Sequence, residues 1–197
     1  MFKVNNGNSK LGKNVMVINL PAISTCRCDA PCKKVCYANK GTFRFPAVRK
    51  CYGENLETFL NNPEQAKLDI LSQMPYIGFC RIHASGDFVN ETYLDMIIDI
   101  CIKLPNVKFM AYTKKYEMFN QYVEEVGELP DNLKIIFSKW DDFPMDNRHN
   151  FPTAYVSLKH GNIDTIPVDA MPCDGECSKC YKCWMLEDGE SVVFNEH

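Results

Sequence analysis

YIGFCRIHASGDFVNETYLDMIIDICIKLPNVKFMAY, residues 76–112, is the stretch that decides the fold. Residues 76–83 form an apolar run that ends in a Ser-Gly-Asp turn, which is typical of a strand followed by a loop. Residues 90–104 predict a helix, because their apolar side chains recur at helical spacing. The stripe consists of Leu94, Ile97, Ile98, Cys101 and Ile102. Residues 107–112 form the next apolar run. A strand, a helix and a strand joined this closely predict a parallel pair with a right-handed crossover.

The same alternation of strand and helix continues on both sides of this unit. Further strands are predicted at 15–20, 133–138 and 153–158, and further helices at 46–60, at 63–74 and around Phe119, Tyr122, Val123 and Val126. Residues 1–14 are polar and rich in Asn, Gly and Lys, so we expect a loose N-terminal arm. The sequence therefore predicts an α/β fold with parallel strands, in an open sheet or a barrel.

Polar residues follow several of these strands. His83 and Ser85-Gly86-Asp87 follow the strand at 76–83, Thr113 follows the next one, and Ser138 ends another. Because the carboxyl ends of parallel strands meet at one edge of the sheet, we expect a ligand site there. Gly86 allows a ligand to approach Asp87 closely. His83 belongs either to this site or to the sheet edge as a satisfied polar residue.

A cysteine-rich loop, CRCDAPCKKVCY at residues 26–37, follows the strand at 15–20. Three thiolates can hold three irons of a [4Fe-4S] cluster and leave the fourth iron open, whereas zinc normally takes a fourth protein ligand. We expect Cys28, Cys32 and Cys36 to be the three ligands, with Cys26 as an alternative to Cys28. Basic neighbours would offset the thiolate charge; they are Arg27, Lys33 and Lys34. Structural zinc or free thiols are the alternative interpretation.

A second cluster lies near the C-terminus, where CDGECSKCYKCW spans residues 173–184. Four thiolates complete either a zinc tetrahedron or a four-iron cluster. The cysteines of this cluster are Cys173, Cys177, Cys180 and Cys183. Zinc sites usually divide into two separated CxxC turns, so the closer spacing favours iron–sulfur, with zinc as the alternative. The remaining three of the eleven cysteines have apolar neighbours and are interpreted as core residues; they are Cys51, Cys80 and Cys101.

Charge and composition restrict the location and the partners. No apolar segment is long enough to span a bilayer and no signal peptide is recognised, so we expect a protein of the cytoplasm, with no membrane partner and with reduced thiols rather than disulfides. The net charge of −3 does not indicate nucleic-acid binding, although it does not exclude it. A basic stretch follows the first cluster and is either a solvated surface or a site for an anionic partner. It contains Lys33, Lys34, Lys40, Arg44, Arg49 and Lys50.

Several of these motifs resemble the phage-associated family called gene product eighty-eight. The similarity extends over nearly the whole chain. The motifs that carry it are Asn8-Ser-Lys-Leu-Gly12, Leu20-Pro-Ala22, Thr25-Cys26, Cys32-Lys-Lys-Val-Cys36-Tyr-Ala38, Arg81-Ile-His-Ala-Ser-Gly-Asp-Phe88, Tyr112-Thr-Lys114 and Cys177–Trp184. This resemblance implies a phage- or bacterium-encoded protein acting in the host cytoplasm, and it carries little biochemistry.

More distantly, the layout is similar to the radical S-adenosylmethionine (SAM) enzymes. Their three-cysteine loop follows the first barrel strand, with an aromatic residue beside the last cysteine, the position that Tyr37 takes here. The second gap between cysteines is one residue longer in this chain than in that family. Their second strand ends in a Gly-Gly-Glu turn, which Ser85-Gly86-Asp87 replaces. A C-terminal extension with an auxiliary cluster also occurs in that superfamily.

This second resemblance implies a partial (β/α) barrel over residues 1–165 and a small cysteine-rich extension over 166–197. It implies an enzyme that binds SAM at an open [4Fe-4S] cluster and generates a 5′-deoxyadenosyl radical to modify an unknown substrate. Electrons would come from a donor such as flavodoxin or ferredoxin. Asp87 would accept from the SAM ammonium group. The other residues expected around SAM are Tyr37, His83, Ser85, Gly86, Thr113 and Ser138.

Two other functions are compatible with the same residues. One is a non-catalytic iron–sulfur or zinc-binding module that engages nucleic acid or a host protein, a function favoured by the altered cysteine spacing. The other is an iron–sulfur enzyme that does not use SAM. The polar loops at the strand ends favour an enzyme, because a binding module would not need them.

Overall fold

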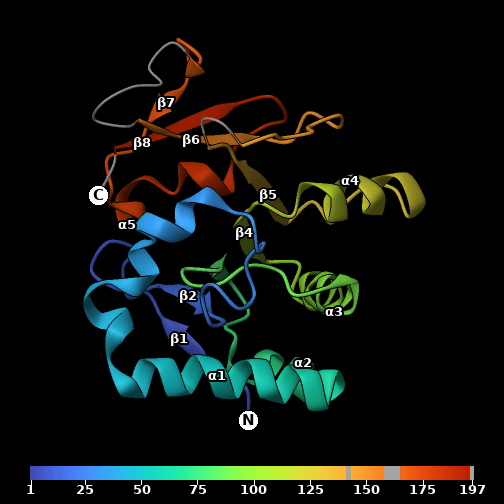
Figure 1. Ribbon diagram of the computed structural model, residues 1–197. Coiled ribbons are helices and arrows are strands. Elements are labelled where there is room, and N and C mark those ends of the chain that lie inside the picture. The colour runs from blue at the N-terminus through green and yellow to red at the C-terminus, as the bar shows by residue number, and fades with distance from the viewer. Residues whose placement is uncertain (141–142, 158–164, 196–197) are drawn as a thin grey trace.

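A computed structural model describes residues 1–140, 143–157 and 165–195. Within them the chain forms one sheet of eight strands in the order β1-β2-β3-β4-β5-β6-β8-β7 (Figure 1). The strands are β1 Val4–Asn6, β2 Val15–Ile18, β3 Gly78–Ile82, β4 Val107–Thr113, β5 Leu133–Ser138, β6 Thr153–Ser157, β7 Met171–Pro172 and β8 Ser191–Asn195. The α-helices are α1 Pro46–Asn61, α2 Pro63–Gln73, α3 Glu91–Lys103, α4 Tyr116–Glu125 and α5 Cys177–Cys180. Short 3-10 helices are η1 Pro31–Val35, η2 Tyr37–Asn39, η3 Gly41–Arg44 and η5 Lys182–Trp184.

Strands β2 to β6 lie side by side in chain order and all run parallel. Only β1 is antiparallel to its neighbour, β2. Right-handed crossovers between strands added in order leave the connecting helices on one face of the sheet. Helices α1 to α4 accordingly lie together on one side of the sheet (Figure 1), where the larger apolar core forms. The predicted α/β fold with parallel strands is therefore confirmed.

Helix α3 shows why the quoted stretch folds as it does. Asn90 begins the helix, because its side chain accepts a hydrogen bond from the backbone N–H of Tyr93 at 3.0 Å. Four residues of the predicted stripe are buried in the larger apolar core, namely Leu94, Ile97, Ile98 and Cys101, whereas Ile102 is 61% exposed and its place in the stripe was wrong. The helix ends at Lys103, two residues before Pro105, because proline has no backbone N–H to continue the helix. Burial of each such side chain stabilises the fold by roughly 1.5–3 kcal/mol.

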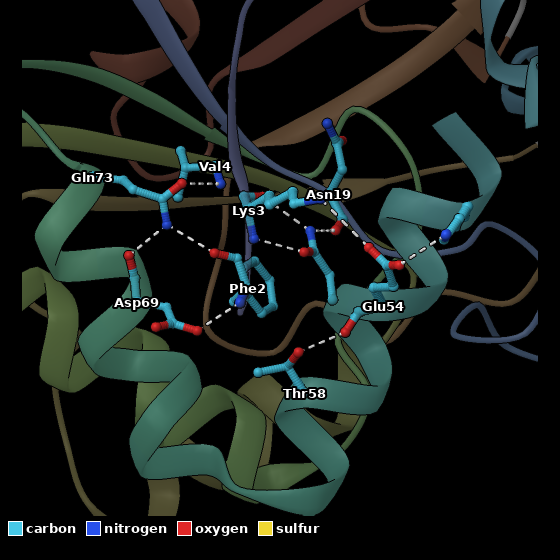
Figure 2. Close-up of polar contacts among 10 residues, drawn as sticks. Phe2, Lys3, Val4, Asn19, Glu54, Thr58, Asp69 and Gln73 are labelled. Carbon is cyan, nitrogen blue, oxygen red and sulfur yellow. Dashed lines mark hydrogen bonds and ion pairs between the residues drawn. The ribbon is translucent and has the colours of Figure 1, made fainter. Parts of the chain in front are cut away.

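The N-terminal segment is not a loose arm, and that prediction was wrong. Figure 2 shows it held between α1 and α2 by polar side chains. The N–H of Phe2, a fully buried residue, donates to Asp69 Oδ2 at 2.6 Å, and the N–H of Val4 donates to Gln73 Oε1 at 3.1 Å. Asn55 accepts from the N–H of Lys3 at 2.7 Å. An edge strand leaves backbone donors unpaired, and side chains of α1 and α2, some fifty or more residues away, satisfy them here.

The C-terminal segment completes the sheet and covers its other face. β8 pairs in parallel with β6, the strand predicted at 153–158, and with β7. Neither β7 nor β8 was predicted from the sequence. Tyr181 stacks on Phe79 of β3 with ring centroids 4.3 Å apart, and Trp184 Nε1 donates to the carbonyl oxygen of Cys80 at 2.9 Å. The domain boundary expected at residue 165 stays a prediction, but the sheet itself runs across it.

Candidate functional site

The loops at the carboxyl ends of β2 and β3 are joined by Asn19, which the sequence did not single out. The buried Asn19 side chain accepts from the N–H groups of Ala84 and Ser85, each at 3.0 Å. The N–H of Leu20 donates to the carbonyl oxygen of Ser85 at 3.0 Å. The turn after β3 is therefore fixed to the start of the segment that leads into the first cysteines.

Asp87 lies at the centre of this edge, almost fully buried. Its Oδ1 accepts from the Thr113 hydroxyl at 2.7 Å and from the N–H of Phe88 at 2.8 Å, and its Oδ2 accepts from the N–H of Lys114 at 3.1 Å. Burial raises the pKa of Asp87, and these donors oppose the shift. One acceptor position on Oδ2 is left for a further donor. The structure thus brings together Asp87 and Thr113, as the positions after neighbouring strands implied.

Gly86 is required by the close approach of two loops. Its φ is +92°, and a Cβ at this position would lie 2.8 Å from Thr25 Oγ1 and 2.9 Å from the carbonyl oxygen of Leu20. Thr25 Oγ1 also accepts from the N–H of Asp87 at 3.0 Å. The chain itself therefore occupies the space beside Gly86, and this contact sets the position of Asp87.

His83 is a buried neutral residue. Its Nε2 lies 2.9 Å from the hydroxyl of Tyr93, and its ring contacts Phe88 edge to face. Burial, assisted by the charge of Arg81, lowers the pKa of His83 to about 3. Its Nδ1 has no hydrogen-bond partner among the described residues. His83 is therefore uncharged near neutral pH, and its assignment to the ligand site stays a prediction.

Lys114 connects two of the predicted positions and was missed by the sequence analysis. Its backbone N–H binds Asp87, whereas its Nζ donates to Ser138 Oγ at 2.7 Å. The Nζ atom also lies 5.9 Å from the centre of the Trp140 ring. The signal available in the sequence was a basic residue directly after Thr113, at the end of a predicted strand. The edge therefore carries a buried carboxylate and a mostly buried ammonium group close together.

The first cysteine loop places the thiol of Cys26 near Asp87 and near the thiols of Cys32 and Cys36. Burial is the main cause of the raised pKa of Cys26, and the charges of Asp87, Cys36 and Cys32 raise it further, so these groups are neighbours. Cys28, in contrast, is exposed. The structure thus groups the alternative ligand, Cys26, with Cys32 and Cys36.

Tyr37, directly after this loop, is half-exposed and joins it to the sheet. Its hydroxyl donates to the carbonyl oxygen of Ala84 at 2.8 Å. Arg27 was expected to offset the charge of the thiolates. In the structure its guanidinium group pairs instead with Asp29 at 2.7 Å and lies over the ring of Phe143. Lys33 donates at 3.4 Å to the carbonyl oxygen of Cys28, on the outer side of the loop.

The four C-terminal cysteines also gather, against the face of the sheet opposite α1 to α4. Burial raises the pKa of Cys183 to about 11, and the thiols of the other three add to this shift. Those three are Cys173, Cys177 and Cys180. Within the described parts of the chain, no three Cys, His, Asp or Glu side chains lie close enough to hold a single metal ion.

Arg81 lies between the two cysteine groups and, like Asn19 and Lys114, was missed by the sequence analysis. Its Nη2 lies 3.4 Å from the hydroxyl of Tyr37, and its guanidinium group lies 5.2 Å from the centre of the Tyr112 ring. The same positive charge lowers the pKa of Cys177, although burial raises that pKa overall. A charged residue within the apolar run at 76–83 was the available signal. Arg81 supplies positive charge to the C-terminal thiols and contacts the loop of the N-terminal thiols.

Comparison with known proteins identifies one family. A family model described as Gene product 88 matches residues 2–186. No curated protein and no solved structure matched the chain. Nothing in these comparisons connects the chain with the radical SAM enzymes, so that resemblance stays a prediction. In the part of the chain that the structure describes, no helix combines the length and the apolar character needed to cross a bilayer. The match over almost the whole length identifies this protein as a member of the gene product 88 family.

Proposed function

We propose that this protein is an iron–sulfur enzyme of the radical SAM type, built on a partial (β/α) barrel with an auxiliary C-terminal centre. One observation carries the proposal: the thiol of Cys26 lies near Asp87, at the carboxyl edge of a parallel sheet, and Cys32 and Cys36 lie near Cys26. Ligands of parallel α/β folds bind at this edge. The strands β2 to β6 follow one another in order, and their helices lie on one face, which supports a partial barrel as the architecture proposed here.

The number of thiols in the first group favours a cluster over a single zinc ion. Zinc normally takes a fourth protein ligand, whereas three thiolates can hold three irons of a [4Fe-4S] cluster and leave the fourth iron open. The thiols of each group interact electrostatically with one another. Cys26, Cys32 and Cys36 would hold the open cluster, and the four C-terminal cysteines would hold the closed one.

The residues beside the first thiols suit the amino-acid part of SAM. Asp87 has one acceptor position left, which fits an ammonium group, and Lys114 has two N–H donors beyond its bond to Ser138, which fits a carboxylate. These two groups form a pair complementary to a zwitterion. When bound, the cluster supplies the one-electron chemistry that cleaves SAM. The chain contributes orientation, and it excludes water through the buried turn at 83–88.

An anaerobic assay tests this function. The protein is purified without oxygen, its iron and sulfide are measured, and 5′-deoxyadenosine is quantified after addition of dithionite and SAM. We expect two loaded clusters and SAM cleavage, lost in Cys32→Ala and retained in Cys51→Ala, a control cysteine of α1 outside both groups. One zinc ion per site with no iron, or cleavage that survives Cys32→Ala, would contradict the proposal.

A further inference from the structure

A cavity of about 320 Å³ lies beside the first cysteine loop, between η2, η3 and α1. This volume is at the lower end of the roughly 300–1,000 Å³ of small-molecule pockets. The residues that matter for its chemistry are Ala38, Asn39, Phe43, Arg49, Tyr52 and Ser85. Ala38 and Asn39 follow Cys36 within three residues, and Ser85 belongs to the turn that carries Asp87. A ligand in this cavity would therefore lie next to the proposed centre.

Aromatic rings form part of the wall. The rings of Phe43 and Tyr52 have centroids 6.5 Å apart, and Tyr37 packs edge to face on Phe43 at 5.9 Å. Rings that line an open cavity offer flat apolar surfaces on which a planar base can stack. The wall thus favours a ligand with an aromatic ring over a purely aliphatic one.

Three polar groups that line the cavity have no partner among the described residues. The guanidinium group of Arg49 and the amide of Asn39 are exposed, and neither they nor the hydroxyl of Tyr52 makes a hydrogen bond or ion pair to any residue that the structure describes. Burial raises the pKa of Tyr52 to about 12, so its hydroxyl stays a donor. Arg49 offers a planar set of donors that matches phosphate. These groups can bind the polar edge of a base and an anion together.

The surface outside the cavity is strongly basic. Residues 30–50 contain six basic residues and no acidic one, although the whole chain has a net charge of −3. Lys34, Lys40 and Arg44 are exposed, and among the described residues only Lys50 of this stretch pairs with a carboxylate, that of Glu54 at 3.7 Å. Such a local excess of positive charge attracts phosphate groups.

We propose that this cavity binds a nucleoside phosphate, with the base against Phe43 and Tyr52 and the phosphate on Arg49. The nucleoside phosphate is either a free nucleotide or one residue of a single-stranded nucleic acid, whose further phosphates would contact Lys40 and Arg44. The assignment of a nucleoside phosphate as the substrate of the enzyme rests on the proposed function. The binding itself depends only on the cavity and its charges.

Titration of the anaerobically purified full-length protein tests the proposal, with AMP and with ten-residue single-stranded RNA and DNA as probes. We expect saturable binding that Arg49→Ala and Phe43→Leu each weaken at least tenfold. The matched control is Lys103→Gln, a lysine of α3 outside this basic stretch that pairs with Asp99 at 3.3 Å, and it should change affinity less than twofold. A phosphate that binds Arg49 also makes the affinity fall as salt rises.

The two probes distinguish the sources of the ligand. An oligonucleotide that binds at least tenfold more tightly than AMP indicates a strand, whereas equal affinities indicate a free nucleotide. Absence of binding by every probe, or unchanged binding in both Arg49→Ala and Phe43→Leu, overturns the proposal. Displacement of AMP by SAM would also overturn it, because the cavity would then belong to SAM. Since no reductant or SAM cleavage enters the titration, its failure is distinct from failure of the proposed function.

Discussion

The hydroxyl of Tyr37 donates a hydrogen bond to the carbonyl oxygen of Ala84 at 2.8 Å and so joins the first cysteine loop to the turn after β3. Arg81 reaches the same hydroxyl from the sheet, with its Nη2 at 3.4 Å. Tyr37 comes directly after Cys36, and Ala84 lies three residues before Asp87. The contact therefore holds the thiols in place beside the carboxylate.

Removal of this hydroxyl tests its contribution to stability. We expect Tyr37→Phe to lower the free energy of unfolding by about 1 kcal/mol, because one intramolecular hydrogen bond is lost and the carbonyl oxygen of Ala84 loses its donor. Chemical denaturation measures the change. Tyr76→Phe is the control, since Tyr76 is 88% exposed, and it should alter stability by less than about 0.5 kcal/mol. Equal stabilities of the two variants would show that the contact contributes nothing.

Replacement of Gly86 separates backbone strain from steric overlap. Gly86 has φ +92° and Gly127 has φ +109°, but a Cβ meets Thr25 and Leu20 only at Gly86, whereas no atom lies within 4 Å at Gly127. Gly127→Ala should cost about 1–3 kcal/mol for strain alone. Gly86→Ala should cost about 1–3 kcal/mol more, because the overlap adds to the same strain. Thermal and urea unfolding compare the two variants, and an equal loss in both would contradict the predicted packing.

The choice between Cys26 and Cys28 can be measured directly. In a background in which the four C-terminal cysteines are replaced by alanine, the iron bound after reconstitution reports the N-terminal centre alone. We expect Cys26→Ala to lose that iron and Cys28→Ala to keep it, because Cys26 lies with Cys32 and Cys36 whereas Cys28 is exposed. The reverse result would assign the centre to Cys28 and would require the loop to rearrange when it is loaded.

The buried His83 predicts a pH dependence of stability. Its pKa is about 3 in the folded protein, chiefly because of burial, and about 6.5 in an unfolded chain. Between these values the unfolded chain binds a proton that the folded protein does not, so stability falls as the pH drops from about 6.5 toward 3. Above about pH 6.5 both states are neutral and the contribution vanishes.

From pH 7 to pH 5 this contribution amounts to about 2 kcal/mol, at about 1.36 kcal/mol per pH unit. Urea unfolding of the wild type and of His83→Gln at both pH values isolates it, since the other titrating groups are common to the two proteins. The wild type should lose about 2 kcal/mol more than the variant on acidification. Parallel pH profiles would show that His83 is accessible to protons in the folded state.

Local sequence was sufficient to predict most helices and strands, but it did not predict several of the contacts between them. The helix at 90–104 was predicted because its apolar period lies within consecutive residues, and the structure has it as α3. The N-terminal strand was missed because its three residues are mostly polar and carry no apolar period, and it is held by pairing with β2 and by Gln73 of α2. β7, with two residues, is too short to carry a period, and β8 was not recognised as an element of the sheet.

For the candidate site, the division is similar. The positions of Asp87 and Thr113 on one edge followed from strands that could be recognised in the sequence. The roles of Lys114 and Arg81 could not be predicted in this way, because the neighbouring sequence of a charged residue does not indicate which groups its side chain contacts. Only packing determines that Lys114 reaches Ser138 and that Arg81 lies between the two groups of cysteines.

The sequence by itself determined a parallel α/β fold and two groups of cysteines, because hydrophobic period and cysteine spacing are properties of neighbouring residues. The tertiary structure decided that Cys26 rather than Cys28 lies near Asp87. It also decided that the C-terminal thiols lie on the face of the sheet opposite α1 to α4. The physical reason is that the burial and the charge around a thiol depend on residues distant in the chain, whose approach only folding determines.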